Sequence, residues 1–271
     1  MRAPAIRAIG LLSGWGSGPA AVPPDAVAAA ADRFVIGLDR PALDPERFRR
    51  SRRECLLGVA AVAAMLEDAG AGPETIAGEG TGLVFVTAAA YAASNREHIE
   101  PGGGSVYFPY TTPAAVPAEV AIAYGVTGPY GILIGGPTAG LEAIAHAAGM
   151  LEAGACSRAL VLGVEIFEEC ADLLRHAGRL SGPLVETAAC LWLEPGQGTM
   201  TLERSRSRRG DRDGVRRRLG EMWSCEPLAA LALHRAAGRG GPLAIDAAWR
   251  GETVRLSFSE APYRDARRRV A

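Results

Sequence analysis

The sequence predicts an α/β fold with a mixed central sheet covered by helices. Short apolar runs that suit buried strands alternate with alanine-rich segments whose apolar residues recur at helical spacing. A glycine-rich turn joins a strand expected at residues 131–134 to a helix expected at 141–151, and another apolar strand is expected at 158–164. This alternation favours parallel strand pairing under covering helices. With 271 residues and 48% hydrophobic content, the chain can bury a substantial core.

The N-terminal elements are assigned from periodicity and from the residues that end each segment. Residues 5–12 and 81–87 are typical of strands, and residues 34–38 form a short apolar run. A helix is expected from Arg49 to Gly70, because glycine suits a helix C-cap. Its apolar face comprises Cys55, Leu56, Val59, Val62, Met65 and Leu66. The roughly twenty residues after Thr87 are expected to be loop, since they are rich in Gly, Ser and aromatics.

The C-terminal elements follow a change in composition. A short helix is expected from Pro117 and a strand at 187–193, after which residues 203–219 carry eight arginines and few apolar residues. A helix at 227–237 and strands at 243–248 and 253–259, joined around Arg250–Gly251, complete the chain. We therefore expect one domain overall, made of a core at 1–202, an arginine-rich linker at 203–224, and a segment at 225–271 that packs on the same core.

Charge and cysteine usage exclude several function classes. The 29 basic residues are all arginine and nearly balance 30 acidic ones, so we expect no nucleic-acid partner, and a Schiff-base or phosphate-loop lysine is excluded. The five cysteines stand singly without CxxC spacing, as core residues of a reducing compartment do. The N-terminus lacks the long apolar region of a signal peptide, and no segment is apolar enough for a membrane span. We expect a cytoplasmic protein without a metal or cofactor.

The segment from Gly128 to Glu165, GPYGILIGGPTAGLEAIAHAAGMLEAGACSRALVLGVE, resembles the centre of a β-ketoacyl synthase of the thiolase-like superfamily. IRAIGLLSGWG, SRRECLLGVAAVAAMLEDAG, TGLVFVT, FPYTTPAAVPAEVAIAYGVTGPY and LVETAACLWLE are similar, in the same order, to successive family segments. The resemblance covers nearly the first 195 residues. It implies a thiolase-like fold, with the ketosynthase N-terminal half present.

The resemblance also implies that the catalytic groups are missing. Members carry an acyl-accepting cysteine on the turn between strand and helix, and Pro137 stands at that position here. The degenerate elbow comprises Gly135, Gly136, Pro137, Thr138 and Gly140. No histidine stands in the settings that the family uses, and only about 70 residues follow Leu202, so the C-terminal half is truncated to a remnant. This combination is similar to a short chain-length factor, the inactive partner of a synthase in type II polyketide or aryl polyene systems.

The resemblance assigns contacts to several segments. It implies pairing with an active β-ketoacyl synthase through Gly131, Ile132, Leu133 and Ile134, because an apolar edge strand needs a partner. It also implies tunnel or partner contacts by Tyr107, Phe108, Tyr110 and Thr111. An acyl carrier protein would meet the complex, and a homodimer is possible when the synthase is absent. The arginine run, including Arg206, Arg208 and Arg209, is either a carrier-protein contact or a solvated linker.

Other interpretations stay open from the residues alone. Thr138 in the Gly136 to Gly140 elbow could serve a hydrolase or acyltransferase, with His234 and either Asp172 or Asp246. The glycine cluster could bind a nucleotide with Glu165 on the ribose, although tight packing is the usual role of such a cluster. A decarboxylating variant would need a histidine pair that is missing.

A small-molecule or acyl-binding homodimer is a further possibility. His146 is expected to be a packed structural residue, and His98 and His176 are expected to be exposed. Glu165, Glu168 and Glu169 could ligate a metal or begin a solvated helix.

Overall fold

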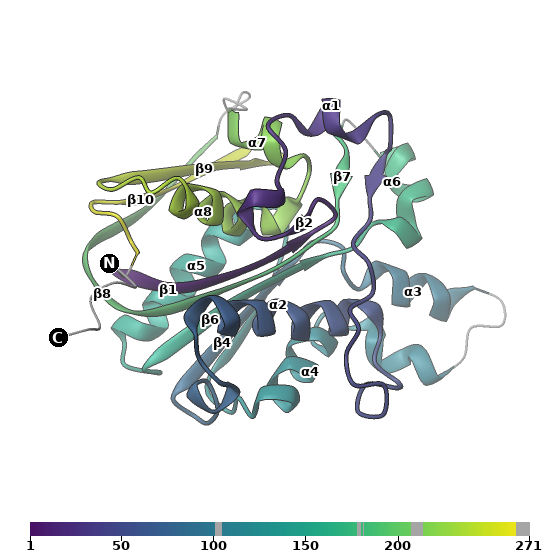
Figure 1. Ribbon diagram of the computed structural model, residues 1–271, viewed down its shortest axis with the longest axis horizontal. Helices are drawn as coiled ribbons and strands as arrows, with labels where there is room; N and C mark the ends of the chain where they lie inside the picture. Colours follow the sequence, from purple (N-terminus) through teal and green to yellow (C-terminus); the bar gives the residue numbers. More distant parts are fainter. Residues whose placement is uncertain (101–104, 178–179, 181, 207–213, 264–271) are drawn as a thin grey trace.

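The computed structural model describes residues 1–100, 105–177, 180, 182–206 and 214–263 of the chain. Its main sheet has the strand order β2-β1-β8-β6-β4-β5 (Figure 1). The strands are β1 (Arg2–Ser13), β2 (Gly16–Ser17), β4 (Thr81–Thr87), β5 (Tyr130–Ile134), β6 (Arg158–Glu165) and β8 (Thr187–Arg206). β4 pairs in parallel with β5 and β6, whereas β8 runs antiparallel to β1 and β6. The expected mixed α/β sheet is therefore confirmed.

Two helices, α2 (Arg53–Ala69) and α4 (Ala115–Tyr124), cover one face of the sheet. The apolar side of α2 is buried with β4, β6 and β8, and all six apolar positions expected from the sequence are buried. The helix ends at Gly70, whose φ of 59° is left-handed and suits glycine. Pro117 lies in the first turn of α4, which begins two residues earlier than expected.

The opposite face is covered by α5 (Pro137–Glu152) and α8 (Glu226–Ala236). Beyond α5 lie β9 (Leu243–Trp249) and β10 (Glu252–Phe258), which pair with each other and, through β10, with the far end of β8. In Figure 1, α2 and α4 lie below the sheet, and α8 lies above it with this hairpin. α5 is thus enclosed between the sheet and the hairpin, and its N-terminus emerges at the carboxyl end of β5.

The remaining elements are short. They are η1 (Pro19–Ala21), α1 (Ala26–Ala30), β3 (Val35–Ile36), η2 (Pro73–Thr75), α3 (Ala92–Ile99), η3 (Ser105–Thr111), η4 (Glu168–Cys170), α6 (Ala171–Ala177), β7 (Leu184–Val185), α7 (Gly214–Leu219) and η5 (Trp223–Cys225). β3 and β7 form a separate two-stranded parallel sheet. In the described part of the chain, no helix is long and apolar enough to cross a membrane.

Two segments differ from their sequence-based assignment. The expected loop after Thr87 contains α3, because Ala93 and Ser94 are buried and the Ser94 hydroxyl donates to the buried Glu54 carboxylate at 2.6 Å. The strand expected to end at Leu193 continues to Arg206, so the boundary expected at Leu202 lies inside β8. Its distal half pairs with β10 from Met200 to Arg206, and that pairing satisfies the backbone hydrogen-bonding groups of the stretch. Because many side chains there are exposed or charged, the sequence shows no strand pattern.

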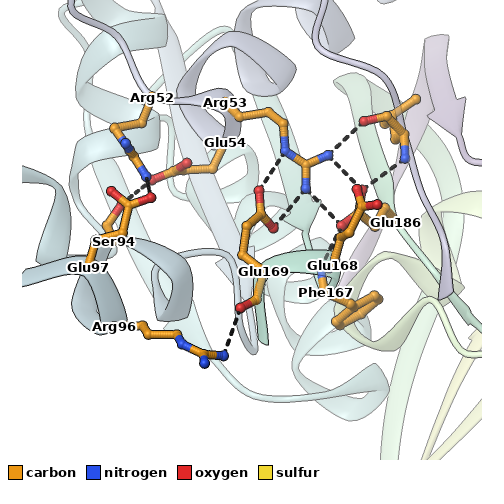
Figure 2. A network of polar contacts seen from close by, with 11 residues as sticks. Arg52, Arg53, Glu54, Ser94, Arg96, Glu97, Phe167, Glu168, Glu169 and Glu186 are labelled. Carbon is orange, nitrogen blue, oxygen red and sulfur yellow. Dashed lines mark hydrogen bonds and ion pairs between the residues drawn. The ribbon is translucent and has the colours of Figure 1, made fainter. Parts of the chain in front are cut away.

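A buried ion-pair network fixes α2 against the loops at the end of the sheet (Figure 2). Arg53 uses all five of its N–H groups: two bond Glu186 at 2.7 and 2.8 Å, two bond Glu169 at 2.9 Å, and one bonds the Leu38 carbonyl at 2.7 Å. Glu186 also accepts backbone N–H bonds from Leu38, Phe167 and Glu168, each at 2.8 Å. One carboxylate therefore connects three separate chain segments.

Candidate functional site

The elbow between β5 and α5 is buried and closely packed. Pro137 occupies the first turn of α5, where its missing N–H costs no helix hydrogen bond. Gly136, Pro137, Thr138 and Gly140 are all buried, and the Gly135 amide donates to the Thr87 carbonyl at 3.0 Å. The structure thus places the five residues of the degenerate elbow together, at the carboxyl end of the parallel strands.

The elbow glycines are required by close neighbours. A Cβ atom at Gly136 would lie 2.3 to 2.7 Å from three ring carbons of Trp249, and one at Gly140 would lie 2.3 Å from the Ser224 carbonyl oxygen. Neither glycine has a left-handed backbone, so the reason for glycine is contact rather than conformation. This packing role opposes the nucleotide-binding interpretation, in which the glycines would approach a phosphate.

Three aromatic rings form a chain of contacts that ends at the elbow. The Trp223 ring centroid lies 4.8 Å from that of Phe167 and 5.5 Å from that of Trp249, both in edge-on geometry. We call Phe167, Trp223 and Trp249 the aromatic plug. The first two rings are buried, whereas Trp249 is half-buried and lies against Gly136.

A buried carboxylate holds the turn that carries Trp223. Glu165, at the end of β6, is fully buried and accepts hydrogen bonds from the Ala88 and Ala89 amides at 2.7 and 3.0 Å. The Ser224 hydroxyl donates to it at 2.5 Å and the Ser224 amide at 3.3 Å, and the Thr87 hydroxyl lies 3.4 Å away. Burial raises the pKa of Glu165 to about 7, against the opposing effect of these donors. With every donor internal, Glu165 is not available to bind a ribose.

The residues proposed for a hydrolase triad are not brought together. His234 Nδ1 lies 3.0 Å from the Tyr263 hydroxyl, Asp172 is ion-paired with Arg96, and Asp246 is ion-paired with Arg255. Thr138, itself an elbow residue, is buried. The acyltransferase or hydrolase alternative therefore has no support from the geometry.

The other titratable candidates lie apart from the elbow. His176 is exposed as expected, whereas His98 is half-buried with its ring 5.6 Å from that of Phe108. The expectation that His146 is a packed residue is wrong: its side chain is exposed, beside Gly131 of β5, because α5 turns this position toward the sheet edge. Among the described residues, no group of three His, Cys, Asp or Glu side chains could hold a metal ion.

The edge strand β5 presents an apolar surface. Within the described chain it pairs with β4 alone. The Tyr130 and Ile134 side chains at its two ends are 69% and 58% exposed, and Gly131, Ile132 and Leu133 between them are partly buried. The segment expected to form an interface is thus an uncovered strand edge with apolar ends.

The residues expected to contact a tunnel occupy different environments. Phe108 is 64% exposed, whereas the half-buried Tyr110 donates its hydroxyl to the Arg50 carbonyl at 2.9 Å. The Thr111 hydroxyl donates to the Phe108 carbonyl at 2.8 Å. The backbone of Tyr107 lies in η3, but its side chain is outside the described part of the chain. Of the three, Phe108 is the side chain free to reach another molecule.

The arginine residues suggested for a carrier protein are described only in part. Arg206 is exposed and forms the end of β8. Arg208 and Arg209 lie outside the described residues. Their role therefore stays a prediction.

Fold, elbow and edge together define a ketosynthase-like protein. Residues 22–180, more than half of the chain, match the family profile for the N-terminal domain of β-ketoacyl synthases. The chain belongs to the β-ketoacyl synthase family. A search of curated protein sequences finds no significant match.

Solved structures with the same fold include chain-length factors. The ishigamide ketosynthase/chain length factor is 17% identical with a TM-score of 0.71, over 95% of this chain and 99% of that chain. A type II PKS acyl-carrier protein in complex with its ketosynthase bound to the hexaketide (AntDE:AntF) is 15% identical with a TM-score of 0.75. The match covers 96% of this chain and 99% of that chain.

The ketosynthase ApeO in complex with its chain length factor ApeC, from Xenorhabdus doucetiae, is 14% identical with a TM-score of 0.67. The match covers 94% of this chain and 99% of that chain. These similarities confirm the thiolase-like fold.

Sequence reasoning missed the plug and the role of Ser224. Trp223 and Trp249 stand in segments that give no motif, and they meet at the elbow only through folding. One signal was present: an acidic residue, Glu165, ends a strand that is apolar after Arg158, and a buried acid must find donors nearby. The identity of those donors depends on the tertiary structure.

Proposed function

We propose that this chain is a non-catalytic subunit of the chain-length-factor type, which pairs with an active β-ketoacyl synthase. One observation carries the proposal: at the elbow, Pro137 stands where the family resemblance puts the nucleophile, and the Trp249 ring lies against the adjacent Gly136. Condensation begins when a thiolate attacks an acyl thioester, and a proline side chain has no atom that can do this. Among the described residues, the four histidines are engaged or exposed away from the elbow: His234 contacts Tyr263, His98 lies beside Phe108, and His146 and His176 are exposed.

The pairing surface that we propose is the edge of β5. Antiparallel addition of a partner strand would satisfy the free backbone groups of residues 130–134 and bury Tyr130 and Ile134. This addition would join the central sheets of the two subunits. The exposed Phe108 on η3 would then contact the partner and help to shape its acyl tunnel.

The partner and substrate classes come from the structural neighbours. Several are ketosynthase and chain-length-factor assemblies, and one is a ketosynthase with its acyl carrier protein. By analogy, we propose an active synthase as the direct partner and a polyketide or polyene chain, carried by an acyl carrier protein, as the substrate of the complex. Arg206 is exposed and is the described residue suited to a carrier contact.

Co-expression with a ketosynthase encoded beside this chain, followed by size-exclusion chromatography with light scattering, tests the proposal. We expect a stable one-to-one complex. Ile134→Glu should abolish it, because a charge at the strand edge would be buried without a counter-ion. Val27→Glu on α1 is a matched control, since Val27 is 59% exposed and Ile134 58%.

The control variant should leave the complex intact. A chain that remains a monomer or homodimer beside the synthase would refute the partner assignment. Equal effects of the two variants would refute the β5 surface while leaving the partner assignment in place.

A further inference from the structure

Trp249 of the aromatic plug lies against the elbow, the turn where the family resemblance places the acyl-accepting residue. We propose that Trp249, supported by Trp223 and Phe167, excludes acyl chains from the elbow of this subunit. This inference rests on the proposed function and adds a specificity-determining residue to it.

The Trp249 ring occupies the space directly above the elbow backbone. Three of its ring carbons lie where a side chain on Gly136 would point, within 2.3 to 2.7 Å of the Cβ position. An acyl chain that entered the turn beside Gly136 would need this volume. Protein interiors are packed without spare volume for a chain of methylene groups. The ring and an acyl chain therefore compete for one place.

Trp223 gives the plug a fixed support. Its backbone has a φ of 44°, which is rare for a bulky residue, and its neighbour Ser224 is held by Glu165 through a 2.5 Å hydrogen bond. Its indole N–H meets no acceptor in the described structure, although the residue is only 8% exposed. Neither local backbone preference nor a hydrogen bond of its own explains this position. Tertiary packing against Phe167 and Trp249 holds the ring in place.

Two of the three plug residues, Trp223 and Trp249, come from the C-terminal part of the chain. Trp249 is the last residue of β9, and the turn that follows has left-handed Arg250 and Gly251, with φ of 50° and 87°. This tight turn fixes the end of the hairpin over the elbow. Arg250 lies 5.7 Å from the Trp249 ring centroid, where its cation faces the ring. The C-terminal part thus supplies an indole ring to the elbow.

Removing the ring should open an apolar pocket beside α5. The decisive experiment uses the full, isolated chain and decanoate as the probe, with binding measured by isothermal titration calorimetry. We expect no saturable binding to the wild-type protein and at least a roughly tenfold gain in affinity for Trp249→Ala, since apolar cavities accept apolar ligands. Trp249→Phe keeps a ring over Gly136 and should stay closed.

Two controls make the result specific. Trp15→Ala removes another half-buried indole, whose ring packs on a different core cluster, and should not create binding. Trp249→Leu replaces the alanine variant if the latter fails to fold, because it shortens the side chain but stays apolar. Wild-type binding as tight as that of Trp249→Ala would overturn the proposal, and so would a folded Trp249→Ala protein that binds no decanoate.

The outcome is separable from the proposed function. Trp249 is not part of the β5 edge, so complex formation with the synthase should be the same for Trp249→Ala and the wild type. If Trp249→Ala and the wild type bind decanoate equally while the complex with the synthase still forms, the plug is refuted and the partner assignment stands. If only Trp249→Ala binds decanoate but neither protein forms a complex with the synthase, the plug stands and the partner assignment is refuted.

Discussion

Two carboxylates, Glu186 and Glu165, are both fully buried near strand ends, yet their pKa values shift in opposite directions. Burial alone would raise the pKa of Glu186, but the hydrogen bonds and charge of Arg53 outweigh it and hold the pKa below its ordinary value. Glu165 has five donors and no cation, and burial raises its pKa to about 7. A charged partner, rather than the number of hydrogen bonds, separates the two sites.

The two sites also serve different parts of the molecule. The Glu186 site joins α2 to the loops behind the sheet and lies in the scaffold. The Glu165 site joins β4 and β6 to the turn of Trp223, which covers the elbow. The scaffold thus depends on an ion pair, and the elbow cover depends on a carboxylate that titrates near neutrality.

The largest expected effect comes from removing the cation. Arg53→Leu leaves Glu186 buried without its counter-ion, and we expect a loss of about 3–5 kcal/mol in the free energy of unfolding. Urea denaturation at neutral pH measures this. The control is Arg255→Leu, which breaks an exposed pair with Asp246 and should cost far less, because solvent screens that pair. A loss of the same size in both variants would mean that burial of the pair has no influence.

The second prediction concerns pH. The folded protein holds the Glu165 proton up to about pH 7, whereas the unfolded chain releases it near 4.5. Stability from this group is therefore complete below pH 4.5 and decreases as pH rises to 7, by about 3 kcal/mol in total. Glu186 behaves oppositely, and its contribution is lost as pH falls below 4.5, because its pKa is lowered in the folded state.

Glu165→Gln removes the titrating group and should flatten the stability profile between pH 4.5 and 7. Denaturation of both proteins across this range, with the difference taken at each pH, removes contributions from other groups. A wild-type profile that stays parallel to that of the variant would show that Glu165 remains ionised throughout.

A smaller effect is expected at Ser224. Ser224→Ala removes the 2.5 Å hydrogen bond to Glu165 and should cost about 1.5–3 kcal/mol at a pH where the carboxylate is ionised. Because this bond lowers the pKa of Glu165, the pKa should rise further in the variant. Ser257→Ala on β10 provides the comparison, since no hydrogen bond from that hydroxyl to a buried carboxylate is present among the described contacts. If Ser224→Ala costs no more than Ser257→Ala, the turn of Trp223 is held by packing instead.

The smallest effect is expected at Glu169. Glu169→Gln weakens the second carboxylate contact of Arg53, but the Glu169 side chain is 35% exposed, whereas that of Glu186 is fully buried. We expect a loss of about 1 kcal/mol or less, measured by the same denaturation. A cost close to that of Arg53→Leu would show that both carboxylates, and not Glu186 alone, govern the network.

Local sequence was sufficient for much of the fold. The strands at 81–87 and 131–134 and the C-terminal hairpin were predicted because each is a short apolar or alternating run. The helix α2 was predicted because its apolar residues recur every three to four positions. The strand at residues 194–206 was not predicted, because the exposed polar and charged side chains there show no strand periodicity. Pairing with β10 decides the conformation of this segment. α3 was missed for a related reason: its buried contact is Ser94 with Glu54, far away in the chain.

By itself, the sequence determined that a proline stands at the elbow and that the strand before it is apolar. Those are properties of covalent structure and local periodicity. Only the tertiary structure decided that Trp249 covers Gly136, that Ser224 meets Glu165, and that the unpaired side of β5 is left at the edge of the sheet. These contacts join residues more than fifty positions apart, and their energies depend on burial and on which groups neighbour one another, which no local segment encodes.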